Sequence, residues 1–333
     1  MSKKGILKLY LFSLTLLAAL TARAQPFLTF TGGIQQVLPD EEKYHDFLVP
    51  ESDSARQLIL ELKGADGGWI EYTYIDRFNE QRTQRVNAGE GATISTTYRI
   101  GTGIGEIPPG ATIRMVIGKR GQWAKYDLLP DGKFGAGGGG GTAILMSRGQ
   151  SSAWQILMVA GAGAGAGVQK MGDQIKYYPG QAGNSDEYSY GNSHPDKIAE
   201  GGTSGGGGKS VETSGGGGGA YGNGEHQLGE LHYGNAGWKD RNLSGEPLGG
   251  IGGTQAGCRN GGWGFGGGGS GGVSGGGGGG YSGGGAGKPG FGGGGGGSYV
   301  ETTAVQASNI SKQQNGDTNN PGDGYVRYLL TDR

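Results

Sequence analysis

The sequence predicts an all-β protein, a β-sandwich that carries an inserted glycine-rich segment. Short runs rich in β-branched and aromatic residues fill residues 26–130, and no long stretch there shows a helical hydrophobic period. Glycine accounts for 81 of the 333 residues, and 56 of these lie in 161–297 against only 13 in 26–130. Strand-forming sequence resumes at residue 298, so the glycine-rich segment lies inside the β-domain rather than after it.

The N-terminus has the pattern of a secretory signal peptide, residues 1–24. The lysine-rich start KKGILK (3–8) precedes the apolar stretch 9–20, and Ala-Arg-Ala (22–24) supplies small residues at the cleavage positions. The apolar stretch is shorter than the roughly 20 residues of a membrane-spanning helix, and no later segment approaches that length. We therefore expect export of a mature chain from Gln25 to the extracellular space, the cell surface or the periplasm.

Charge and cysteine content narrow the classes of partner. The leader holds four of the 28 basic residues, so the mature chain has 24 basic residues against 29 acidic ones. This balance argues against a nucleic-acid partner, which requires a basic face. Cys258 is the single cysteine and excludes an intrachain disulfide. We expect a buried, inert thiol there, with a thiol that links to a partner as the alternative.

The strands are predicted by alternation and by the turns between them. Ile70, Tyr72 and Tyr74 fall on one face of a strand, with Glu71 and Thr73 on the other. Glycine, asparagine and proline clusters separate the runs. The predicted strands are residues 27–31, 45–49, 57–64, 69–75, 93–100, 112–118, 142–147, 153–160, 298–300 and 324–330.

Three connections complete the predicted domain organisation. Arg148-Gly149-Gln150 and its neighbours join 142–147 to 153–160 as a hairpin, and the polar run 312–324 is a loop before the last strand. The sandwich is therefore assigned to 25–160 plus 298–333, and the glycine-rich insertion to 161–297.

Ordering the insertion costs much backbone conformational entropy, because ordering a glycine costs roughly 0.5–1 kcal/mol more than ordering an alanine. Favourable interactions must offset this cost if the insertion is ordered. Extended helices of the polyproline II type, with three residues per turn, could pack side by side without Cβ atoms. Each hydrogen bond between neighbours contributes about 1 kcal/mol, close to the cost. Aromatic residues that punctuate the insertion indicate packing rather than a flexible linker. The expected structural residues are Gly161, Gly163, Gly275, Gly280, Gly292, Gly297, Trp263, Phe265 and Tyr281.

Two glycine motifs suggest nucleotide binding but lack its context. Gly161, Gly163 and Ala166 fit G-x-G-x-x-G/A, yet no helical pattern follows them to face a pyrophosphate. Gly208-Lys209-Ser210 matches the end of a phosphate loop, but Thr203 stands where its first glycine belongs. We expect no cofactor.

The region GEHQLGELHYG (224–234) offers the only grouping of potential metal ligands. His226, His232 and Glu230 could hold zinc or copper, although their spacing matches no standard ligand set. A solvated polar loop is the simpler interpretation. No Ser/His/Asp ordering above chance indicates a nucleophilic enzyme.

The order of strands and glycine blocks resembles the extracellular glycine-rich domain of the anaplastic lymphoma kinase and leukocyte tyrosine kinase receptors. The resemblance rests on HDFLVPESDSARQLILELKGADGG (45–68), TYRIGTGIGEIPPGATIRMVIGKRGQ (97–122), GAGGGGGTAILMSRGQSSAWQILMVAGAGAGAG (135–167), GCRNGGWGFGGGGSGGVSGGGGGGYSGG (257–284) and DGYVRYLL (323–330). It implies a tumour-necrosis-factor-like jelly-roll sandwich with an inserted bundle of polyglycine helices. It also implies binding of protein ligands. The chain departs from the family in lacking a kinase domain, a membrane helix and all of its cysteines but one, at Cys258, and its leader looks bacterial.

These observations predict a secreted or surface-exposed, non-enzymatic protein that recognises a protein or glycan partner or serves as a structural element. By analogy with other jelly-roll proteins, the chain could also form a homo-oligomer. One rival is a secreted hydrolase or metal enzyme, which requires convergent histidines and carboxylates in a cleft. Another is a β-domain presented on a flexible glycine spacer.

Amide hydrogen exchange separates a packed insertion from a spacer. We expect slow exchange across 201–297 in the mature chain, because its amides would be bonded between neighbouring segments. Mass spectrometry of the exchanging protein measures this directly. Exchange at the rate of a free peptide would reduce the insertion to a tether.

Overall fold

The computed structural model has β-strands as its only extended regular structure, and no helix occurs in the part of the chain that it describes. Among these residues no helix could cross a membrane. The signal peptide predicted at 1–24 lies outside them. The described residues are 28–31, 44–51, 56–149, 153–191, 199–225, 233–238 and 247–332.

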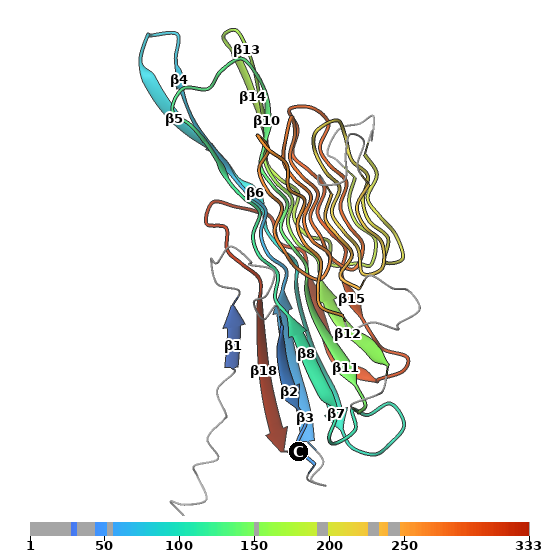
Figure 1. Cartoon of the computed structure of the whole chain (residues 1–333). Coiled ribbons are helices and arrows are strands. Elements are labelled where there is room, and N and C mark those ends of the chain that lie inside the picture. The colour runs from blue at the N-terminus through green and yellow to red at the C-terminus, as the bar shows by residue number, and fades with distance from the viewer. Residues whose placement is uncertain are drawn as a thin grey trace, which may run out of the picture.

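Two five-stranded antiparallel sheets form a β-sandwich-like body (Figure 1). Every neighbouring pair in both sheets is antiparallel. The first sheet has the order β1 (Leu28–Thr31), β18 (Tyr325–Asp332), β3 (Arg56–Lys63), β7 (Thr93–Ile100), β16 (Ala307–Gln313). The second has the order β15 (Tyr299–Val300), β12 (Trp154–Ala160), β11 (Thr142–Ser147), β8 (Thr112–Val116), β2 (His45–Leu48).

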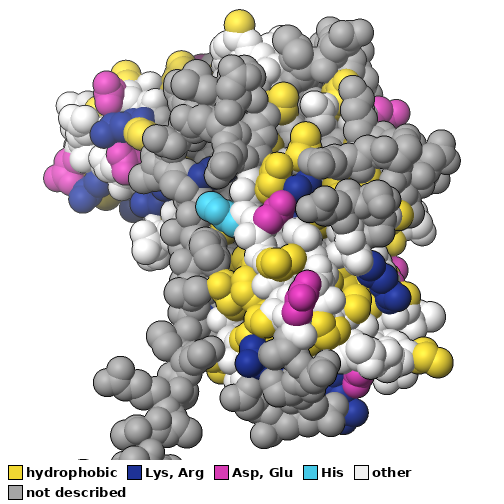
Figure 2. Space-filling view, turned by 60° about the horizontal axis from the view of Figure 1, so that its bottom comes forward, with side chains coloured by type: hydrophobic (Ala, Val, Ile, Leu, Met, Phe, Trp, Pro, Cys, Tyr) yellow, Lys and Arg dark blue, Asp and Glu magenta, His cyan; other side chains and the backbone are white. Residues whose placement is uncertain are grey.

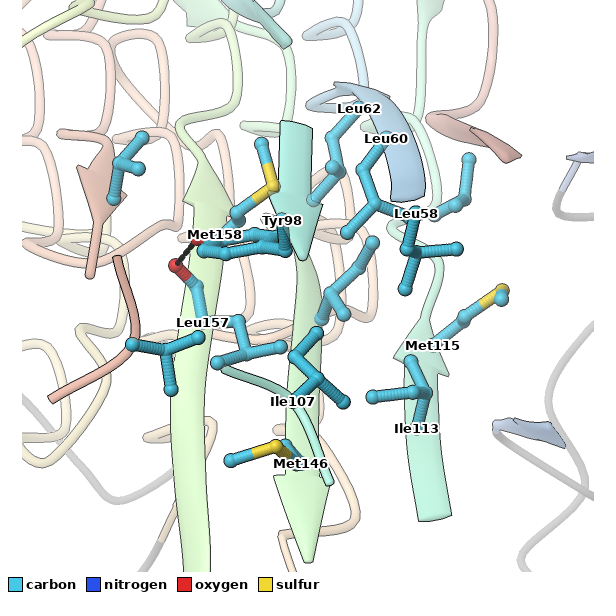
Figure 3. Packing of buried hydrophobic residues seen from close by; sticks show 14 of the residues in the cluster. Leu58, Leu60, Leu62, Tyr98, Ile107, Ile113, Met115, Met146, Leu157 and Met158 are labelled. Atoms are coloured by element: carbon cyan, nitrogen blue, oxygen red, sulfur yellow. Dashed lines mark hydrogen bonds between the residues drawn. The ribbon is translucent and has the colours of Figure 1, made fainter. Parts of the chain in front are cut away.

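The core lies between these sheets and follows from the alternation of their strands. Leu58, Leu60 and Leu62 of β3 are fully buried and face apolar residues of β8, β11 and β12 (Figure 3). Burial of each such side chain contributes about 1.5–3 kcal/mol. Tyr98 of β7 adds a polar link across the core, because its hydroxyl donates to the carbonyl oxygen of Leu157 at 3.0 Å. Burial raises the pKa of the Tyr98 phenol far above its usual value and keeps it a donor.

Three smaller sheets lie outside the sandwich. The hairpins β4–β5 and β13–β14 reach the end of the molecule far from the sandwich, which we call the apical end (Figure 1). These sheets comprise β5 (Gln81–Val86), β4 (Ile70–Ile75) and β9 (Ala124–Tyr126); β10 (Gly132–Gly135), β13 (Gly167–Met171) and β14 (Gln174–Tyr178); and β17 (Asp317–Thr318) with β6 (Ala88–Gly89).

The predicted all-β class is confirmed, and the core strands lie where the sequence placed them. Several segments differ from the predictions, among them Gln81–Val86, Ala124–Tyr126 and Gly132–Gly135, which are strands that the sequence did not predict. The polar run 312–324 is not wholly a loop, because it contains the end of β16 and all of β17. The residues that follow Ala166, to which no strand was assigned, form β13 and β14. In each case pairing with a neighbouring strand overrides a weak local signal.

Strand-free segments that bond to one another make up what we call the glycine layer, which stands on the sandwich in Figure 1. The layer comprises 64–68, 118–122, 136–141, 161–166 and the described residues of 179–298. It thus includes segments that precede the predicted insertion at 161–297, while β13 and β14 lie within that range.

Hydrogen bonds in the glycine layer repeat with a period of three residues. Along 275–281, amides three positions apart donate to the same neighbour, so three different segments receive bonds in turn. The bonds run from Gly275, Gly278 and Tyr281 to Phe291, Gly294 and Gly297, from Gly276 and Gly279 to Ala136 and Gly139, and from Gly277 and Gly280 to Gly215 and Gly218, at 2.8–3.2 Å.

The carbonyl groups of 275–279 accept from three further segments. Donors lie in 162–165, at Gly269 and in 284–287. The segment is therefore surrounded by neighbours on all sides and satisfies its backbone polar groups without a sheet. These hydrogen bonds take the place of the bonds that a strand would make to its neighbours in a sheet.

Such close neighbours leave no room for a side chain. A Cβ atom added to Gly277 would meet the carbonyl oxygen of Gly284 well inside the 3.0 Å that real Cβ atoms keep. The same holds for Gly276, Gly278 and Gly279 toward backbone atoms of other segments. Glycine is required here by the approach of neighbouring backbones.

The substitution Gly277→Ala tests this packing. We expect it to lower the free energy of unfolding by roughly 1–3 kcal/mol or more, because backbone segments must move apart. Gly316→Ala is the matched control, since a Cβ there meets nothing within 4 Å. It should be neutral or stabilise by up to about 1 kcal/mol through the unfolded state. Denaturant unfolding measures both, and equal effects would contradict the packing argument.

Candidate functional site

A groove of about 600 Å³ opens at the apical end, and we call it the apical groove. It lies between the hairpins β4–β5 and β13–β14, which come from distant parts of the chain. Its volume falls in the range of pockets that hold small ligands. The lining residues are Tyr72, Tyr74, Ile75, Asp76, Arg77, Asn79, Gln84, Asp173, Ile175 and Tyr177.

Local sequence builds the β4–β5 wall of the groove. The Asp76 carboxylate accepts the backbone N–H groups of Phe78 and Glu80, both at 2.9 Å, and the Arg82 Nε at 3.1 Å. Asn79 takes the left-handed backbone conformation that the turn needs, with φ of 59°. The hydrogen bonds from Glu80, Arg82 and Phe78 lower the pKa of Asp76, so the turn is held by an ionised carboxylate.

The opposite wall is the hairpin β13–β14. Gly172 has φ of 59° and Asp173 follows it, so the two strands are joined by a tight turn. Pairing aligns Val168 with Tyr177 and brings Ile175 opposite Lys170. Tyr177 is half exposed and lines the groove.

Tyr74 and Tyr177 present apolar surface to the groove, and Tyr72 supports its wall from within. Tyr72 is fully buried, its ring centroid lies 6.0 Å from that of Tyr74, and its hydroxyl donates to Gln84 Oε1 at 2.9 Å. Burial, reinforced by Tyr74 and Tyr177, raises the pKa of Tyr72 to about 12. Tyr72 is therefore a protonated donor at neutral pH.

The polar groups of the groove carry little net charge. Arg77 supplies one positive charge, and Asp76 and Asp173 supply two negative ones. The Arg77 guanidinium lies 4.8 Å from the centroid of the Phe78 ring. The Asp76 carboxylate is engaged in the hydrogen bonds of its turn, so Asp173 is the carboxylate that remains to bind a ligand.

Apolar side chains surround the groove at the apical end. Phe78, at the tip of β4–β5, is 67 % exposed, and Met171, at the tip of β13–β14, is 60 % exposed. Ile75 is exposed on the groove itself, and Leu128 on the loop after β9 is exposed as well.

The opposite end of the molecule has a mixed surface. Figure 2 views the molecule from the sandwich end, where hydrophobic side chains are interspersed with acidic and basic ones.

The glycines predicted to be structural lie in the glycine layer. Gly161 and Gly163 follow β12, and their amides donate to Ser298 Oγ and to the Ala65 carbonyl oxygen, both at 2.9 Å. Gly275 and Gly280 belong to the period-three segment. Gly292 and Gly297 have neighbouring backbone atoms where a Cβ would stand.

The three predicted structural aromatics join the glycine layer to the outer face of the second sheet. Trp263 and Phe265 are buried in one cluster with Val116, Leu145 and other residues of that sheet. Tyr281 packs against the same cluster and stacks on Tyr299 with ring centroids 4.5 Å apart. This second core anchors the layer.

The predicted metal ligands His226, His232 and Glu230 lie outside the described residues. Within the described ranges, no group of three or more His, Cys, Asp or Glu side chains is placed to hold a metal ion. The Cys258 thiol is partly buried, and burial raises its pKa. Its sulfur lies 3.7 Å from the Thr213 carbonyl oxygen.

Sequence reasoning missed the apical groove. The available signal was the dipeptide Gly172-Asp173 between the short runs VQKM and QIKYY, which is typical of a hairpin. No local signal could place Tyr177 beside Tyr72, because the two residues are far apart in the chain.

Comparison of the chain with models of known protein families found no match, and comparison with curated proteins found none either. The resemblance to the glycine-rich domain of the receptor kinases therefore stays a prediction that rests on the quoted residues.

The pKa of Tyr72 predicts a change in stability at high pH. A phenol whose folded-state pKa exceeds its unfolded value of 10 stabilises the fold below pH 10, and this contribution is lost as the pH rises toward 12. The loss is on the order of 2 kcal/mol. Tyr72→Phe lacks the hydrogen bond to Gln84 and should be about 1 kcal/mol less stable at pH 8. Its deficit should shrink or reverse near pH 12 in denaturant unfolding. A constant deficit would contradict the assignment.

Proposed function

We propose that this protein is an exported, non-enzymatic recognition protein that binds its partner through the apical groove. The observation that carries the proposal is the convergence of Tyr74 and Tyr177 with amide, carboxylate and guanidinium groups in one groove on two hairpin tips. A concave site with an apolar lining and a few placed polar groups is typical of ligand binding. Export is supported by the leader sequence of residues 1–24.

We further propose that the glycine layer is a bundle of polyglycine helices of the polyproline II type. The period of three in its hydrogen bonds supports this, because such a helix has three residues per turn. The bundle would serve as a rigid platform between the sandwich and the site. Assignment of the sandwich to the tumour-necrosis-factor-like jelly roll rests on the receptor-kinase resemblance.

The apical end suits contact with a surface. Four exposed apolar side chains, those of Ile75, Phe78, Leu128 and Met171, stand at this end, where they would be available to contact a partner that covers the groove. The site is also far from the sandwich, so a sandwich held at one surface would present the groove to another (Figure 1).

Adhesion of the labelled mature chain to intact cells tests this function. Wild-type protein should bind to at least one surface in a panel of bacterial and animal cells. Tyr177→Ala should reduce binding at least tenfold, because it removes a half-exposed wall of the groove. Ile104→Ser is the control, since Ile104 is 99 % exposed on the loop between β7 and β8 at the sandwich end. Equal binding by wild type and Tyr177→Ala would overturn the proposal.

A further inference from the structure

We infer that the ligand of the apical groove is a neutral oligosaccharide. The inference rests on the proposed function, because it assigns a ligand class to the same groove. It follows from three properties of the lining: its aromatic faces, its unengaged hydrogen-bonding groups and its charge.

Aromatic faces suit sugars because a pyranose ring has an apolar face of C–H groups and an edge of hydroxyls. Tyr177 is 50 % exposed in the groove, and Tyr74 is partly buried beside it. Tyrosine presents a flat apolar body with a polar tip, so one residue contacts both parts of a sugar. The described structure gives neither hydroxyl a protein hydrogen-bond partner.

The second property is a set of polar groups that face the groove without competing partners. Asp173 makes no hydrogen bond or ion pair to the described residues, and the Asn79 side chain makes none either. Gln84 Oε1 is occupied by Tyr72, which leaves the Gln84 amide N–H groups as donors. Donors and acceptors are therefore both present, and a sugar hydroxyl needs both because it donates once and accepts twice.

The third property is the nearly neutral charge of the lining, which favours neutral sugars over anionic ones. Lipid and protein ligands are disfavoured on other grounds. One arginine and two aspartates line the groove, and Asp76 is paired with Arg82, so this nearly neutral lining offers phosphate, sulfate and carboxylate groups little attraction. A lipid would leave the amides and Asp173 unsatisfied, at about 1–3 kcal/mol for each buried group. A stable protein interface involves about 20–30 residues on each side, whereas ten residues line the groove.

Binding of defined sugars to the full mature chain tests the inference. The probes are neutral trisaccharides of glucose, mannose, galactose and N-acetylglucosamine, with a sulfated disaccharide as the anionic comparison. We expect saturation-transfer NMR and calorimetry to detect at least one neutral probe. Tyr177→Ala and Asp173→Ala should each weaken it at least tenfold, and Tyr177→Phe much less. Tyr188→Ala should bind as wild type, since Tyr188 is 53 % exposed and lies outside the groove.

Cell adhesion separates failure of this inference from failure of the proposed function. Periodate cleaves vicinal diols, so we expect pretreated cells to lose adhesion of the wild-type protein, while protease-treated cells retain it. If adhesion depends on Tyr177 but survives periodate and is lost after protease, the partner is a protein, and only the glycan assignment fails. Tighter binding of the sulfated probe than of every neutral one would also overturn it. If Tyr177→Ala adheres normally, the groove is not the binding site and both proposals fail.

Discussion

The fold depends on hydrogen bonds between backbone segments that have no side chains to keep them apart. In 275–280, where every residue is glycine, each amide bonds to another segment, and the bonds turn to a new neighbour at each residue. Neighbouring carbonyl oxygens stand where Cβ atoms would be, so the bonds exist only because the residues are glycine. Each bond contributes about 1 kcal/mol, and each ordered glycine costs a similar amount. Such a layer would be only marginally stable by itself, so its segments must be anchored at their ends by the rest of the fold.

The ends are fixed by buried polar side chains and by an aromatic core. Asp66 accepts the Lys63 ammonium at 2.7 Å and the amides of Gly91 and Gly322 at 2.8 and 2.7 Å. It thereby ties three chain segments together where β3 enters the layer. Burial raises the pKa of this carboxyl, opposed by Lys63 and the two amides. On another side of the layer, Trp263 and Phe265 bury their rings against the second sheet.

The sequence predicted the parts of the fold whose residues carry their own signal. The alternation of leucines in 57–64 and of Ile70, Tyr72 and Tyr74 in 69–75 predicts strands, because the leucines, Ile70 and Tyr72 are buried. The run Gln81–Val86 was missed because its exposed residues are polar on both faces, and its pairing with β4 makes it a strand. Neighbours within the glycine layer could not be predicted, because Gly277 and Gly278 are identical residues that bond to different segments. The metal-ligand prediction lies outside the described residues and stays a prediction.

The glycine layer also explains how two distant hairpins can form one groove. The segment 64–68 leads into β4, and the segment 161–166 leads into β13. These two segments bond directly, from the Gly163 amide to the Ala65 carbonyl oxygen at 2.9 Å and from the Ala166 amide to the Gly68 carbonyl oxygen at 3.0 Å. The spacing of the hairpin bases is therefore set by backbone geometry rather than by adaptable side chains. Because that spacing is fixed in advance, the binding that we propose for the groove would lose less conformational entropy than binding between two mobile hairpins.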